Sequence, residues 1–65
     1  MFNVVGLNKV NRAYIFSGML QYLPRIGEQM EFDGMVYDVN NIIYTPTNGN
    51  SLNVNVRIYL TFARQ

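Results

Sequence analysis

The C-terminal segment alternates between apolar residues and residues that are mostly polar. The apolar positions are Leu52, Val54, Val56, Ile58, Leu60 and Phe62, and between them lie Asn53, Asn55, Arg57, Tyr59, Thr61 and Ala63. A two-residue period sustained over this length predicts a long β-strand with one buried side and one solvent-facing side. No helix would place those apolar residues on one side. The segment therefore favours a fold built on β-structure.

Three short signals predict two turns between strands and one bulge within a strand. Asp33-Gly34 predicts a two-residue type I′ turn, because both residues tolerate positive φ. Asn40-Asn41 supplies an extra residue between the apolar positions Val39 and Ile42, which predicts a β-bulge that bends the strand. Asn48-Gly49 predicts the turn that precedes the C-terminal strand.

The remaining apolar runs are also typical of strands, because Val, Ile, Tyr, Phe and Thr dominate them. We expect five strands joined by short loops in a meander-like order, at residues 2–7, 12–20, 29–32, 35–45 and 52–63. So short a chain predicts one small all-β domain spanning residues 1–65. We expect a five-stranded, strongly bent antiparallel sheet or a partly open small barrel.

One stretch resembles a known pattern. It reads Leu23-Pro24-Arg25-Ile26-Gly27-Glu28, then Phe32-Asp33-Gly34-Met35-Val36-Tyr37-Asp38-Val39, and then Ile42-Ile43-Tyr44. This stretch is similar to small bacterial and phage β-barrel proteins that read L-P-R-x-G-E, an apolar-D-G turn and Y-x-V-x-x-V-x-Y. The resemblance covers about a third of the chain and implies an SH3-like barrel. An accessory protein of a phage or mobile element that acts on a host or defence protein would fit the small size of the chain.

The two N-terminal runs carry apolar residues on both of their faces. Within residues 12–20 one face holds Tyr14, Phe16 and Leu20, and the other holds Ala13, Ile15 and Met19. One face would fill the barrel, and the other would meet a second subunit or another protein. A chain of 65 residues is near the lower limit for unaided folding, which favours a homodimer. We expect its interface to include Tyr14, Phe16, Leu20 and Tyr22; a well-packed monomer is the alternative.

The composition excludes several classes of chemistry. The chain has no Cys and no His, so it lacks a thiolate, a disulfide and the usual general base near neutral pH. We expect no enzyme activity, no catalytic residue, no bound metal and no cofactor. No apolar run is long enough for a transmembrane helix, and no signal peptide is recognisable. We expect a complete small cytoplasmic protein without a membrane partner.

The polar side of the C-terminal strand is the candidate partner-binding surface. Asn53, Asn55, Arg57 and Tyr59 place amides, a guanidinium and a phenol in one row, although an ordinary solvated strand face is the alternative. We expect a non-enzymatic module that binds itself and another protein. The alternative function is a small barrel that binds single-stranded nucleic acid on its tyrosines and arginines. A net charge of +1 offers little positive field for that function.

Overall fold

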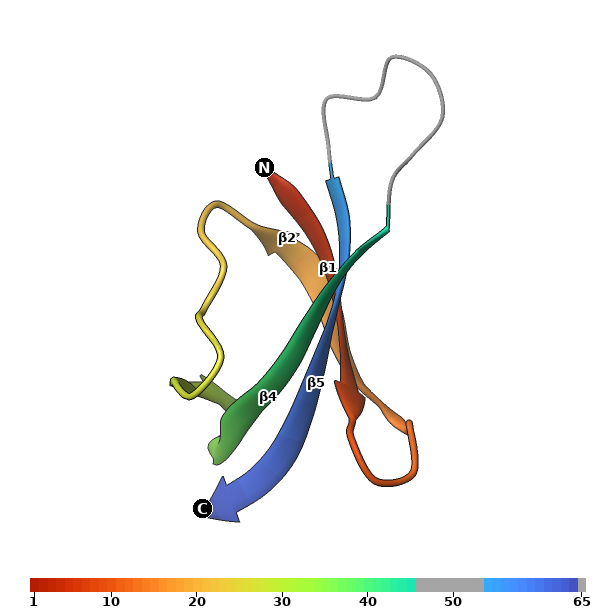
Figure 1. The fold of residues 1–65 in the computed structure, drawn as a ribbon. Coiled ribbons are helices and arrows are strands. Elements are labelled where there is room, and N and C mark those ends of the chain that lie inside the picture. Colours follow the sequence, from red (N-terminus) through yellow and green to blue (C-terminus); the bar gives the residue numbers. More distant parts are fainter. Residues whose placement is uncertain (46–53, 65) are drawn as a thin grey trace.

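The chain forms one five-stranded sheet, which the computed structural model describes over residues 1–45 and 54–64 (Figure 1). The strands are β1 (Phe2–Asn8), β2 (Tyr14–Leu20), β3 (Gln29–Phe32), β4 (Met35–Thr45) and β5 (Val54–Arg64). The predicted all-β fold and its five strands are confirmed; the expected strand positions 52 and 53 and the Asn48-Gly49 turn lie outside the described residues. Over the two described ranges, no helix has the length and hydropathy needed to span a bilayer.

The strand order is β2-β1-β5-β4-β3. Three neighbouring pairs are antiparallel, but β1 and β5 pair in parallel. The expected meander is present in β3, β4 and β5, while β1 and β2 form a separate hairpin that is added beside β5. The sheet is therefore mixed, and the connection over residues 21–28 runs from one edge strand to the other.

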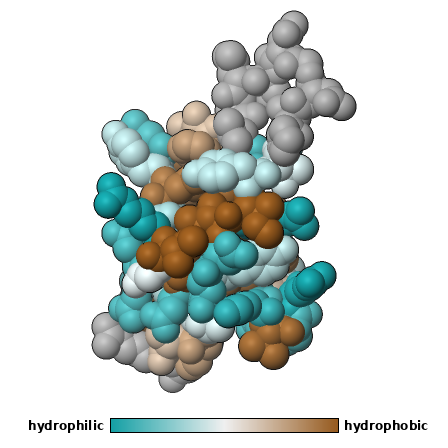
Figure 2. Space-filling model, viewed as in Figure 1, coloured by the Kyte–Doolittle hydropathy of each residue, from teal (hydrophilic) through white to brown (hydrophobic). Residues whose placement is uncertain are grey.

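Three register shifts interrupt the sheet. One of them lies near the end of β5, where Val36 pairs with Arg64 and Tyr37 with Phe62, which leaves Ala63 extra. In β4, Val39 pairs with Leu60 and Asn41 with Tyr59, which leaves Asn40 as the extra residue. This confirms the bulge predicted at Asn40-Asn41. A further bulge lies in β2 at its pairing with β1. Gly6 pairs with Phe16 and Leu7 with Tyr14, which leaves Ile15 as the extra residue. The bent sheet forms a strongly curled half-barrel, consistent with a small open barrel, and apolar side chains form a band across the face shown in Figure 2.

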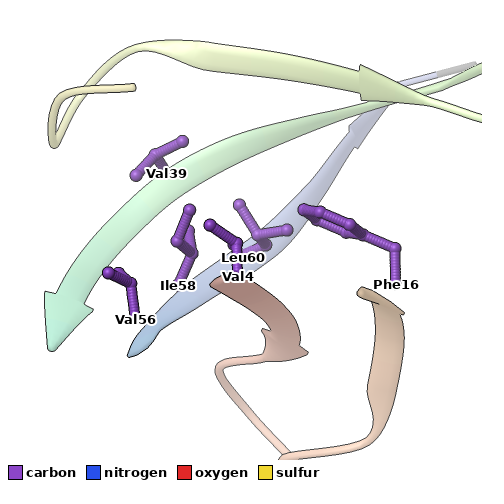
Figure 3. Close-up of a cluster of buried hydrophobic side chains, with 6 residues drawn as sticks. All are labelled: Val4, Phe16, Val39, Val56, Ile58 and Leu60. Atoms are coloured by element: carbon purple, nitrogen blue, oxygen red, sulfur yellow. The ribbon is translucent and has the colours of Figure 1, made fainter. Parts of the chain in front are cut away.

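The concave side of the half-barrel holds the core. Its buried side chains come from four strands and point toward one another in Figure 3: Val4, Phe16, Val39, Val56, Ile58 and Leu60. The alternation predicted for β5 is confirmed at Val56, Ile58 and Leu60, whereas Phe62, predicted on the same buried side, is 52% exposed. The Phe16 ring also stacks on Phe32 of β3, with centroids 5.2 Å apart. Since β2 and β3 are the two edge strands, this aromatic contact links the edges without a backbone ladder.

The connection between β2 and β3 packs against this core. Leu23 contacts the buried cluster. The backbone of β4 holds the end of the connection in place, since Gly27 N donates to Val39 O and Val39 N donates to Glu28 O, both at 2.9 Å. Gly27 has a φ of 95°, which favours glycine. The predicted loop therefore also serves as a cover for part of the concave side.

The next connection is the predicted type I′ turn. Asp33 and Gly34 have φ values of 54° and 79°. Both central residues of a type I′ turn have positive φ, so the prediction from Asp33-Gly34 is confirmed. The turn fixes β3 against β4, with Phe32 paired to Met35.

Candidate functional site on the outer face of the sheet

Three rows of side chains cross the side of the sheet that points away from the core. The strand registers across β2, β1, β5 and β4 give the rows Tyr14–Leu7–Tyr59–Asn41, Ser17–Val5–Arg57–Ile43 and Met19–Asn3–Asn55–Thr45. We call this set the outer face. Three of the predicted partner-binding residues, Asn55, Arg57 and Tyr59, lie next to one another along it. The fourth, Asn53, lies outside the described residues.

Two local hydrogen bonds account for part of the polarity of the outer face. Asn3 Nδ2 donates to Asn55 Oδ1 at 3.1 Å, across the parallel β1–β5 pair. The hydroxyls of Tyr14 and Ser17 lie 3.0 Å apart within β2. Asn55 therefore links β5 to β1 through its side chain, a role that the sequence did not predict.

Two surface depressions lie on the outer face, on either side of the Arg57–Ile43 row. The first is lined by Asn3, Val5, Thr45, Asn55, Val56 and Arg57. The second is lined by Lys9, Arg12, Asn41, Ile43 and Tyr59. The structure thus brings two cations from the β1–β2 turn beside Tyr59, a grouping that sequence analysis missed.

The β1–β2 turn holds these cations on an ordered backbone. Asn8 Oδ1 accepts a hydrogen bond from Val10 N at 2.8 Å, and Asn8 O accepts one from Arg12 N at 2.7 Å. Lys9 N donates to Leu60 O of β5 at 2.8 Å, which attaches the turn to the central strand. Arg12 has a φ of 61°, in the left-handed region that non-glycine residues seldom occupy. The signal available in the sequence was Asn8, since asparagine forms such turns with its side chain.

Charges are segregated across the sheet. The four carboxylates, Glu28, Glu31, Asp33 and Asp38, belong to the end of the 21–28 connection, to β3 and its turn, and to β4. None of them belongs to the outer face as defined above or lines either depression. The nearest is Asp38, which pairs with Thr61 and therefore lies on the same side of the sheet, one row beyond Tyr59. Its Oδ1 accepts a hydrogen bond from Gln29 Nε2 at 3.0 Å. The outer face is therefore locally cationic although the net charge of the chain is only +1.

The four residues predicted to mediate self-association do not share one surface. Phe16 is buried in the core and Leu20 packs partly against it, whereas Tyr14 and Tyr22 are 66% and 79% exposed. The reason is the bulge at Ile15, which reverses the alternation and turns Tyr14 to the outer face. The grouping on one surface is thus corrected, and self-association itself stays a prediction.

Comparisons with known proteins add no relative. No protein-family model, no curated protein and no solved structure matches the chain. The resemblance of residues 23–44 to small bacterial and phage β-barrel proteins therefore stays a prediction. Function has to be argued from the surfaces of this chain.

Proposed function

We propose that this chain is a non-enzymatic interaction module that associates with a second copy of itself and with another protein. The observation that carries the proposal is strand β2. It is an edge strand, with a neighbour on one side only in the described part of the chain, and none of its seven residues is charged. An uncharged edge of this length offers unpaired backbone groups to another strand.

The opposite edge strand, β3, is less suited to pairing with another strand. Strand β3 has only four residues and contains Glu31, and short, charged edges resist pairing. By comparison, β2 carries Tyr14 and Met19 on its outward side, and Tyr22 follows two residues after it; all three are exposed. A β2 edge paired with its copy would satisfy backbone groups and bring these apolar side chains into an interface.

A second exposed apolar cluster suits another protein. Phe32, Met35 and Phe62 are 41%, 36% and 52% exposed, and Tyr37 contacts Phe62 edge to face with centroids 6.0 Å apart. Aromatic residues and methionine are enriched in protein interfaces. With the resemblance described above, this cluster supports the proposal of a cytoplasmic phage or mobile-element accessory protein that acts on a host or defence protein.

Light scattering on a size-exclusion column tests the self-association. We expect a mass of twice 7.5 kDa for the natural chain at micromolar concentration. Met19→Lys should shift it toward 7.5 kDa, because a lysine on an edge strand opposes pairing. Val10→Lys is the matched control, since Val10 is 85% exposed in the β1–β2 turn and the added charge is the same. A monomer at every concentration, or equal masses for the two variants, would refute the proposal.

A further inference from the structure

We propose that the outer face binds single-stranded nucleic acid, with Lys9, Arg12 and Arg57 contacting phosphates and Tyr59 and Tyr14 stacking on bases. This inference goes beyond the proposed function, because it requires neither self-association nor a protein partner. It shares Tyr14 with the β2 edge, but its cations and Tyr59 lie away from that edge and from the Phe32, Met35 and Phe62 cluster.

Three cationic side chains line the depressions of the outer face. Lys9 and Arg12 line one depression, and Arg57 lines the other. Arg57 lies on the same side of β5 as Tyr59, two residues away, which is about 7 Å along a strand. These cations belong to the β1–β2 turn and to β5, and the three rows of the outer face contain no carboxylate. Cations placed in this way form a track for a phosphate backbone rather than a single ion-pair site.

Two tyrosine rings of the outer face lie near these cations. Tyr14 and Tyr59 lie in the same row with Leu7 between them, so the two phenols sit two strands apart, about 10 Å. Tyr14 is exposed and Tyr59 is half-buried. Proteins that bind single strands stack bases on aromatic side chains that line a basic groove. In this arrangement the rings can stack on bases while the neighbouring cations contact phosphates.

The β1–β2 turn, which carries Lys9 and Arg12, is attached to the sheet by hydrogen bonds. The Asn8 side chain and the Lys9 N to Leu60 O hydrogen bond fix the turn on β5. Arg12 keeps a left-handed backbone in which glycine would be more relaxed. The turn therefore holds the Arg12 guanidinium beside Tyr59 on an ordered backbone, where it can contact a phosphate.

Fluorescence anisotropy with a labelled oligothymidine of about 12 nucleotides, within the length that small barrels cover, measures the binding. Three phosphate contacts predict a slope of about −2 for log K against log salt, so a fourfold rise in salt weakens binding about 20-fold. Duplex DNA of the same sequence length should bind more weakly, since its bases are not available to stack on tyrosine.

Five variants assign the contacts. Arg57→Gln and Arg12→Gly should each weaken binding and flatten the salt slope by about 0.7. Arg25→Gln is the matched control, because it removes the same charge from the 21–28 connection and should leave binding unchanged. Arg12→Gly also relieves the left-handed backbone, so its lost binding would not come from unfolding. Tyr59→Leu should weaken binding about tenfold or more, while Tyr59→Phe keeps the ring and should retain it.

Several results would overturn the inference. It fails if the oligothymidine does not bind at low salt, or if Arg25→Gln weakens binding as much as Arg57→Gln. It also fails if polyglutamate competes as well as the oligonucleotide does, which would point to an acidic protein partner. These outcomes leave the self-association of β2 untouched, because the Met19→Lys experiment is scored on molar mass alone.

Discussion

Gly6→Ala tests whether the curled sheet depends on one close contact between β1 and β2. Gly6 pairs with Phe16 across the two strands, and the Phe16 ring lies over it. A Cβ at position 6 would stand 3.2 Å from Cζ of Phe16 and closer still to Cε1 and Cδ1. The ring cannot easily move away, because Phe16 is only 7% exposed and stacks on Phe32.

The expected cost follows from two opposing effects. Overpacking a well-filled core costs about 1–3 kcal/mol. Replacing glycine by alanine within a strand recovers about 0.5–1 kcal/mol of backbone entropy. We therefore expect Gly6→Ala to lower the free energy of unfolding by about 1–2 kcal/mol. Adding Phe16→Leu should recover part of this loss, with a coupling of about 0.5–3 kcal/mol typical of residues in contact.

Urea unfolding followed by circular dichroism measures these changes, at one protein concentration because association would shift the midpoint. Gly18→Ala is the matched control on β2, since a Cβ there would meet nothing within 4 Å. It should be neutral or stabilising by about 0.5–1 kcal/mol. If Gly6→Ala unfolds at the same urea concentration as Gly18→Ala, the Gly6–Phe16 contact does not have the role assigned to it.

Three further substitutions test other parts of the fold by the same unfolding measurement. Gly34→Ala should destabilise by about 1–2 kcal/mol, because alanine does not readily adopt positive φ, and an unchanged midpoint would count against the type I′ turn. Asn40→Ala removes the hydrogen bond from Asn40 Nδ2 to Thr61 Oγ1 at 2.7 Å and should cost about 0.5–1.5 kcal/mol; no loss would mean that the bulge needs no such support. Ile58→Ala should cost about 2–5 kcal/mol, because Ile58 is fully buried, and a loss below that range would place it outside the core.

Local signals in the sequence predicted much of the sheet. The alternation of β5 identified its buried side, because a two-residue period follows directly from strand geometry. Asp33-Gly34 and Asn40-Asn41 predicted a turn and a bulge, since each depends on backbone preferences of adjacent residues. These features need no knowledge of distant contacts.

The parallel pairing of β1 with β5 could not be predicted in this way. Alternation gives the same pattern for parallel and antiparallel neighbours, and it does not say which strands meet. The bulge at Ile15 was also missed, because no sequence signal marks Ile15. That bulge reverses the alternation, and for this reason Tyr14 and Phe16 were wrongly grouped on one face.

The candidate site was predicted only along its own strand. Asn55, Arg57 and Tyr59 follow from the alternation of β5, but Lys9 and Arg12 join Tyr59 only through the β1–β5 pairing. Contacts between residues so far apart in the sequence depend on the topology. The net charge of +1 therefore did not indicate that cations gather on the outer face, because net charge does not show where charges lie in the fold.

Amide hydrogen exchange as a function of protein concentration tests the central claim most directly, namely that β2 pairs with a second copy of the chain. Amides of β2 that point away from β1 should become protected as concentration rises, while the outer edge of β3 should exchange at a constant rate. Concentration-independent exchange along β2, or protection that grows equally on β3, would contradict the account.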